Sequence, residues 1–217
     1  LTEAEIAELF GPPILSSNDQ RFFFTLNDAE LAECNRIRER DHRCMFVVLL
    51  GYFKVKPIML SPGYHQIKQD LKYVCSEVFP GPGLRPFNLT QKARVRIYQR
   101  IFKLTGHQRW LNKSHSSALI KDLNEHARAW GQPRSLFDRA IECLSAQKVA
   151  IPGYTVLQDL ISEVVGVTND QFVRKLEELI SADLAVMLSE LVIGNNSLTL
   201  RQLRQSPRQF SVLRRQS

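Results

Sequence analysis

The stretch TQKARVRIYQRIFKL, residues 90–104, carries two neighbouring rows of side chains at helical spacing. The apolar row consists of Ala93, Ile97, Ile101 and Leu104. The basic row lies one residue earlier and consists of Lys92, Arg96, Arg100 and Lys103. Positions three and four residues apart share one face of a helix. The stretch therefore predicts a helix that buries its apolar row and presents a basic row, which no Asp or Glu of the stretch neutralises.

Positive charge is unevenly distributed along the 217 residues, whose formal net charge is +7. The range 78–121 holds nine Lys and Arg residues and no acid, and the range 191–217 holds five Arg and no acid. The first 35 residues show the opposite balance, with seven acids and one Arg. Segregated positive charge attracts polyanions, of which nucleic acid and anionic membranes are the usual examples. A basic face that is only solvated is the alternative interpretation.

The composition is that of an ordinary globular protein, with 44% hydrophobic and 24% charged residues. The longest apolar run, residues 45–50, is far shorter than the roughly twenty residues that a membrane span requires. The sequence starts acidic and shows no signal-peptide pattern. We therefore expect a cytoplasmic protein and no membrane partner; a bacterial, nucleoid-associated setting is what the family resemblance given below implies.

No catalytic or metal-binding motif stands out in the sequence. The four cysteines occur without a CxxC pair, and the five histidines without an HExxH motif. Free thiols in apolar helices, in a reducing cytosol, are the expected state of the cysteines. We expect no enzyme activity, metal or cofactor for this chain, unless folding creates a buried carboxylate or histidine cluster.

The apolar periodicity predicts an all-α fold. Asn27, with Glu30 three residues later, forms a capping-box pattern that predicts a helix with Leu31 on its inner side. Ser61 and Pro62 predict the start of a helix that continues to residue 78. The other expected helices are 42–53, 90–104, 114–130, 135–147, 155–165, 169–181 and 183–193; the segment FFFTL, 22–26, is ambiguous.

Two segments, residues 45–74 and 135–165, resemble helix-turn-helix units, although ordinary helical hairpins fit the same pattern. In each unit the second helix would present polar side chains to base edges in the major groove. The candidate base readers are His65, Gln66, Gln69 and Lys72 in the first unit, and Tyr154, Thr155 and Gln158 in the second. Asp159 and Glu163 would repel phosphates, so only the first turn of the later helix is expected to touch DNA.

Four segments occur in the order and spacing found in the N-terminal region of one transposase family. They are LTEAEIAELFGPP (1–13), FFTLNDAELAECNRIRERDHRCMFVVLLGYFKV (23–55), RVRIYQRIFKLTGHQRW (94–110) and LFDRAIECLSAQKVAIPGYTVLQDLI (136–161). Over about residues 1–165 the chain thus resembles the Tn-three family of replicative transposases. It departs from the family where Arg43, rather than Asn, follows Asp41 and His42, and where VVLL replaces ALQL.

The resemblance implies that this chain binds the terminal inverted repeats of a transposon. In such transposases the Asp, Asp and Glu triad, which uses Mg²⁺, lies in a downstream domain, so this part is expected to be non-catalytic. Self-association belongs to the full-length transposase. A helical scaffold with a basic face for an acidic protein partner is the competing interpretation.

The Pro- and Gly-rich segment PGPGLRPFNL suggests a division of the chain. We expect a first DNA-binding module at 1–79, a linker at 80–89, a second module at 90–166 and a helical extension at 167–217. The side chains expected to contact phosphates are Arg43, Lys92, Arg94, Arg96, Arg100, Lys103, Arg109 and Lys113.

Overall fold

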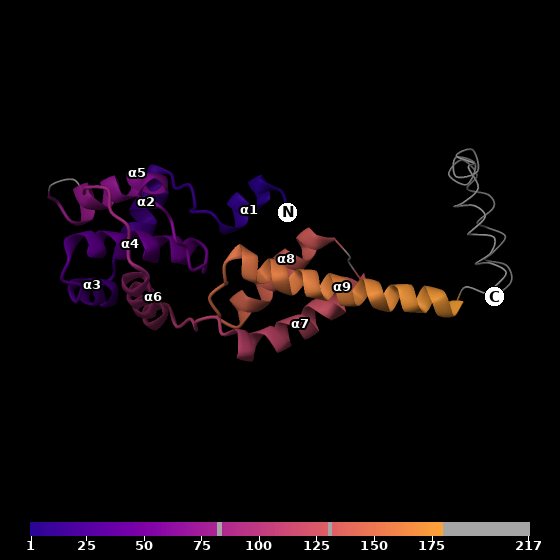
Figure 1. Cartoon of the computed structure of the whole chain (residues 1–217). Helices are drawn as coiled ribbons and strands as arrows, with labels where there is room; N and C mark the ends of the chain where they lie inside the picture. The colour runs from indigo at the N-terminus through magenta and orange to yellow at the C-terminus, as the bar shows by residue number, and fades with distance from the viewer. Residues whose placement is uncertain (82–83, 130–131, 180–217) are drawn as a thin grey trace, which may run out of the picture. The chain divides into compact units, whose positions relative to one another are not determined.

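The computed structural model describes residues 1–81, 84–129 and 132–179 (Figure 1). The chain divides into two compact units, Leu1–Thr168 and Asn169–Ser217. The first unit holds every candidate site residue. In the second unit, the described residues are those that continue the last helix to Leu179. The predicted helix 183–193 and the arginines after residue 191 lie outside the described residues.

The described residues confirm the predicted all-α fold. Their α-helices are α1 Glu3–Phe10, α2 Ser17–Phe24, α3 Asp28–Asn35, α4 Arg40–Val55, α5 Lys68–Tyr73, α6 Gln91–Thr105, α7 Asn112–Ala129, α8 Pro133–Ala146 and α9 Tyr154–Leu179. A 3₁₀ turn, η1 Tyr64–Gln66, precedes α5, and a π-helical turn, η2 Val74–Val78, follows it. Within these ranges β pairing is limited to two isolated bridges, Ile58 with Ile151 and Gln108 with Val149.

Side-chain caps fix the starts of several helices. Thr2, Ser16 and Asn27 each form a capping box with the acid three residues later, and these boxes open α1, α2 and α3. The box of Asn27 confirms the prediction for that helix. Thr90 accepts a hydrogen bond from the amide of Ala93, so α6 begins where the sequence places it. Gly106, in a left-handed conformation with φ of 69°, ends α6.

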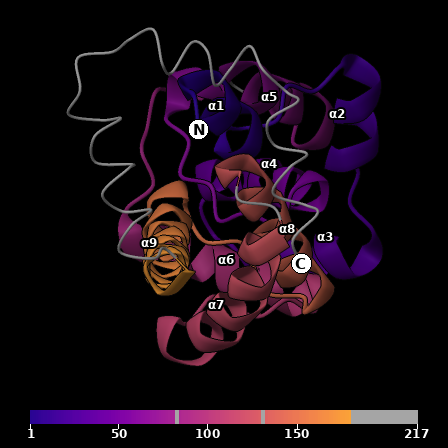
Figure 2. The ribbon, with the colours of Figure 1, turned by 90° about the vertical axis from the view of Figure 1, so that its right-hand side faces the viewer.

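Helix α4 forms the centre of the core. All of its residues from Cys44 to Phe53 are buried. It packs against α2, α3, α5 and α6, and it lies among α2, α3 and α5 in both views (Figures 1 and 2). The contact with α2 is close at Gly51, where an added Cβ would lie 2.5 Å from Cδ1 of Phe24. The absence of a side chain at Gly51 is what lets the Phe24 ring approach.

The structure differs from the helix expectations at several places. The ambiguous segment at 22–26 is helical as far as Phe24, and α1 and α2 were not expected. Leu31 lies outside rather than inside, with 41% of its surface exposed. The segments 155–165 and 169–181 are not separate, because α9 runs without a break from Tyr154 to Leu179.

The predicted helix at 61–78 is also wrong, both in its start and in its continuity. Ser61 and Pro62 lie before the first helical turn, and Ile67, with φ of −117° and ψ of 12°, interrupts the helical path between η1 and α5. Asp70 on α5 is buried and accepts hydrogen bonds from Gln20 and from the hydroxyl of Tyr52. These contacts from α2 and α4 fix α5 independently of the turn before it.

Several contacts connect residues on the two sides of the predicted linker at 80–89. The buried hydroxyl of Tyr98 on α6 donates to the carbonyl of Leu60 at 2.8 Å. The ring of Phe10 on α1 packs against Phe137 and Tyr154. The division into two modules stays a prediction, and any division has to preserve these contacts.

A basic groove as candidate nucleic-acid interface

Helix α6 has the two faces that its sequence predicts. Ile97 and Ile101 of the apolar row are buried, as are Tyr98 and Phe102 beside them. In the basic row Lys92, Arg96 and Lys103 are exposed, whereas Arg100 is half-buried. The apolar face anchors α6 to the core, and the rigid helix therefore holds the basic row in a fixed position.

Lys92, Arg96 and Arg100 of the basic row lie along one wall of a groove of about 710 Å³. The other wall is the connection between α3 and α4, residues 36–39, together with His42 at the start of α4. The lining consists of Arg36, Ile37, Arg38, Glu39, His42, Thr90, Lys92, Ala93, Arg96, Ile97 and Arg100. Five of these side chains are Lys or Arg and one is an acid. Such a groove suits a polyanion, and Ile37, Ala93 and Ile97 add apolar contacts to its lining.

Arg36 and Arg38 were not among the predicted site residues. They belong to the run RIRER, residues 36–40, in which three arginines occur within five positions. That run lies more than fifty residues before α6, and only the fold brings it opposite Lys92 and Arg96. The density of arginines in a short connection between helices was the available signal.

A single buried carboxylate, Glu33 in the last turn of α3, connects the two walls. Its Oε2 accepts a hydrogen bond from Arg100 at 2.7 Å, and its Oε1 contacts Arg36 and lies 3.3 Å from the Nζ of Lys103. Only 8% of the surface of Glu33 is exposed. Burial opposes ionisation of the carboxyl group, but the hydrogen bonds from Lys103 and Arg100 outweigh it and hold the pKa of Glu33 below its ordinary value. The row that lacks a local acid is thus partly neutralised by a distant one.

The remaining cations of the groove have no such partner. Among the described residues, no carboxylate lies within ion-pair distance of Arg38, Lys92 or Arg96. The one acid of the lining, Glu39, lies 3.2 Å from the ring of His42. The groove therefore contains three unneutralised cations, one on the loop wall and two on the helix wall.

Three other predicted phosphate contacts, Arg43, Arg94 and Arg109, do not line this groove. The guanidinium of Arg43 lies over the ring of Phe79 at 5.6 Å from its centroid, and its Nε is buried without a hydrogen-bond partner. Arg94 is half-buried and donates to the side chain of Gln91 at 3.4 Å. Arg109 is exposed, next to the bridge at Gln108. The side chain of Lys113 lies outside the described part of the structure.

The first set of predicted base readers does not lie on one helix. The expectation that a single helix presents all four side chains is therefore wrong. His65 and Gln66 belong to η1, whereas Gln69 and Lys72 belong to α5, and the break at Ile67 separates the two elements. The Oε1 of Gln66 accepts the amide hydrogen of Gly63 at 2.8 Å. Gln66 therefore has a local role in closing the turn.

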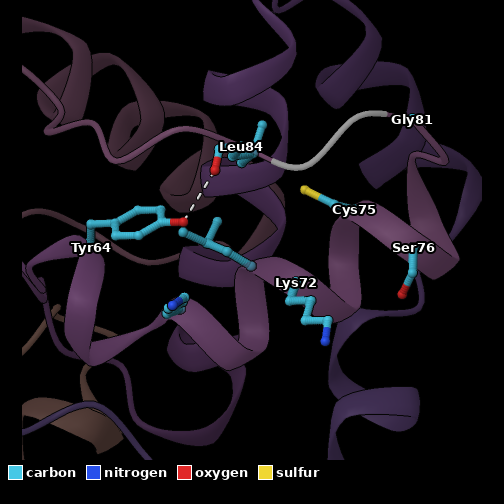
Figure 3. Close-up of a pocket in the computed structure, with 8 residues that line it drawn as sticks. Tyr64, Lys72, Cys75, Ser76, Gly81 and Leu84 are labelled. Atoms are coloured by element: carbon cyan, nitrogen blue, oxygen red, sulfur yellow. Dashed lines mark hydrogen bonds between the residues drawn. The ribbon is translucent and has the colours of Figure 1, made fainter.

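Lys72 borders a separate cavity of about 320 Å³ (Figure 3). Tyr64 reaches across this cavity, and its hydroxyl donates to the carbonyl of Leu84 at 3.2 Å. Cys75 and Ser76 contribute to the same wall. The cavity is thus distinct from the basic groove, with which it shares no lining residue.

The second set of predicted base readers lies at the start of α9. Thr155 and Gln158 are exposed in its first turns. Tyr154 is half-buried, and its ring stacks on Phe137 with centroids 5.7 Å apart and planes inclined by 16°. Asp159 and Glu163 are exposed farther along the helix. The first turn of α9 thus offers two polar side chains, while the tyrosine packs against α8.

The cysteines are placed as structural thiols. Cys34, Cys44 and Cys75 are buried, and the sulfur atoms of Cys44 and Cys75 lie 3.6 Å apart. Burial raises the pKa of the Cys34 thiol to about 11 and that of Cys44 to about 12. Thiols with such high pKa values are poor nucleophiles near neutral pH.

The described ranges hold no group of three or more His, Cys, Asp or Glu residues suited to a metal ion. No helix within them is long and apolar enough to cross a bilayer.

Comparison with known families gives one match. The model of a family described as "Domain of unknown function (DUF4158)" matches residues 1–164, which include every residue of the basic groove and the start of α9. A comparison with curated proteins gives no match.

Proposed function

The chain belongs to the family described as "Domain of unknown function (DUF4158)", and from that premise we propose that it is the DNA-binding N-terminal part of a replicative transposase. Its ligand is the terminal inverted repeat of the transposon. The family match at residues 1–164 coincides with the range, about 1–165, over which the sequence resembles Tn-three transposases. The resemblance supplies the kind of DNA, and the groove supplies a place to hold it.

The observation that carries the proposal is the pair of basic walls around the groove. Arg and Lys side chains that contact phosphates release condensed counterions from DNA, which gives most of the sequence-independent affinity. Among the cations that line the groove, Arg38 on one wall, and Lys92 and Arg96 on the other, have no carboxylate at ion-pair distance in the described part of the chain. They are therefore available to phosphates without first breaking an ion pair.

The number of available cations sets the expected salt dependence. Each phosphate contact lowers the slope of log K against log salt by about 0.9. Three contacts in the groove therefore contribute about 2.7 to that slope. Phosphate contacts fix the register of a protein on the duplex but carry no sequence information, so base reading needs other side chains.

Base reading is assigned to the first turns of α9. Thr155 and Gln158 are exposed there, and Gln is suited to pair with the N6 and N7 atoms of adenine. The exposed Asp159 and Glu163 keep the rest of the helix away from the phosphates. Gln69 on α5 remains a second candidate, since it is exposed and lies on a helix of its own.

The chemistry of transposition belongs to another part of the parent protein. In this proposal the present chain has no catalytic role and no cofactor, and the Mg²⁺-dependent triad lies downstream. The protein acts in the bacterial cytoplasm on double-stranded DNA, and assembly of transposase subunits involves the full-length protein.

Fluorescence anisotropy with labelled duplexes tests the proposal. We expect the 217-residue chain to bind a transposon-end duplex more tightly than a scrambled duplex of equal length, and both affinities to fall steeply with salt. Equal affinity for both duplexes, with a slope near zero, would show that the basic face serves something other than DNA. Tight binding of an acidic polypeptide under the same conditions would then favour the scaffold interpretation.

A further inference from the structure

We infer that Glu33 is a positioning residue of the basic groove, which fixes Arg36 and Arg100 on its two walls before a ligand arrives. The consequence for DNA affinity rests on the proposed function. The positioning itself is a property of the free protein.

The geometry places Glu33 where the two walls meet. Both oxygens of its carboxylate are used: Oε2 binds Arg100 of α6, and Oε1 binds Arg36 of the connecting loop and Lys103 of α6. Arg36 and Lys103 are 67 residues apart in the sequence, so the carboxylate joins distant parts of the chain. Because Glu33 is 8% exposed and Arg100 is half-buried, solvent screens the contact between them less than it screens a surface ion pair, whereas the side chains of Arg36 and Lys103 are exposed.

The charge balance explains how an acid can assist a site for a polyanion. One negative charge faces three positive charges, so the cluster keeps a surplus of two. Free Arg and Lys side chains lose rotamer freedom when a ligand fixes them. Side chains that the protein has already fixed lose less on binding, which increases affinity through preorganisation.

This role makes a prediction opposite in sign to that of simple electrostatics. Removing any acid near a polyanion site should strengthen binding by reducing repulsion. If Glu33 positions the cations, its removal should instead weaken binding, although the protein becomes more positive. Glu39 is the matched control because it lines the same groove, is exposed and contacts only the ring of His42 among the described ion pairs.

The first experiment compares Glu33→Gln and Glu39→Gln in the full chain by anisotropy with a transposon-end duplex. At one fixed salt concentration we expect Glu33→Gln to lose affinity at least about threefold, on the order of the effect of having to order one rotamer-rich side chain on binding. We expect Glu39→Gln to bind the duplex more tightly than the wild type. Tighter binding by both variants, each folded by circular dichroism, would overturn the inference.

The second experiment observes the arginine side chains of the wild type without DNA. In ¹⁵N–¹H spectra of the guanidinium groups, we expect slow rotation for Arg36 and Arg100 and fast rotation for Arg38 and Arg96. Equally fast rotation of all four would overturn the inference even if Glu33→Gln fails to fold. This measurement stays decisive if the wild type binds no duplex, an outcome that would refute the proposed function alone.

Discussion

The clearest prediction concerns one unpaired cation from each wall of the groove. Arg38→Gln and Arg96→Gln each remove a positive charge while keeping a polar side chain. Neither residue has a carboxylate at ion-pair distance among the described residues, so neither change leaves a buried acid behind. Both are exposed, and we expect the fold of the double variant to be unaffected.

The expected magnitude follows from counting phosphate contacts. Each lost contact makes the negative slope of log K against log salt less steep by about 0.9, and the double variant makes it less steep by about 1.8. Between about 50 mM and about 200 mM salt, a fourfold change, one contact corresponds to a factor of about 3.5 and two contacts to about 12. Over this range the affinity of the double variant should therefore fall about 12-fold less than that of the wild type.

Anisotropy titrations of a labelled duplex at several salt concentrations measure these slopes. Arg21→Gln is the control, because Arg21 is an exposed cation on α2 and does not line the groove. That control should leave the slope unchanged. A double variant with the wild-type slope, and with the wild-type melting temperature, would refute the assignment of the groove to phosphates.

Three further predictions test other parts of the molecule. Gly51→Ala should lower the free energy of unfolding by about 1 to 3 kcal/mol, measured by urea denaturation, because its Cβ would meet the ring of Phe24. Gln158→Ala should weaken the binding free energy for the matched repeat by about 1 to 3 kcal/mol and change that for a non-specific duplex little. If binding selections on randomised transposon ends give the variant the same base preferences as the wild type, α9 does not read bases. The third prediction concerns acid pH. Hydrogen bonds from Arg139 hold the pKa of Asp122 below its ordinary value of 3.8. The ionised Asp122 therefore contributes fully to stability above pH 3.8, and this contribution is lost as the pH falls through the pKa of Asp122 in the folded state. Asp122→Asn should accordingly be less stable than the wild type at pH 7, with a difference that shrinks below pH 4; a constant difference in urea midpoints would contradict this.

Local sequence patterns correctly predicted those features that depend only on residues close by in the sequence. The rows of α6 and the cap at Thr90 depend on residues within one or two turns, and both are present in the structure. The short helices α1 and α2 were missed, although TEAE (2–5) and SSND (16–19) contain the same capping-box signal as Asn27 and Glu30. In these helices the cap was a better guide than apolar periodicity, since an eight-residue helix completes only about two turns.

The break at Ile67 could not be predicted from its neighbours. The residues before and after it keep an amphipathic pattern, and contacts from other helices hold α5 in its place. Asp70 is held by Tyr52 on α4 and Gln20 on α2, which are 18 and 50 residues away. A continuous helical pattern cannot report such contacts.

The groove was only half predictable for the same reason. The helix wall follows from the spacing of Lys92, Arg96 and Arg100, but the loop wall depends on how α3 and α4 pack against α6. The counter-charge was hidden for this reason too, because Glu33 lies 67 residues before Arg100. Charge counted within a segment overestimates the charge that a folded surface presents.

The bridges of the α8–α9 connection have a consequence for how the sequence can vary. The amides of Ala150 and Ile151 donate to the carbonyls of Gln108 and Pro57, and the amide of Gln108 donates to Lys148, so these joints use main-chain atoms alone. Pro57 fits because its carbonyl, and not the N–H that proline lacks, makes the bond. Gln108, which is exposed, can therefore vary over evolutionary time while the segments after α4 and α6 stay joined to the start of α9, and the buried Ala150 and Ile151 can vary within the limits of core packing. The exception is proline at Gln108, Ala150 or Ile151, where losing one N–H would open the joint.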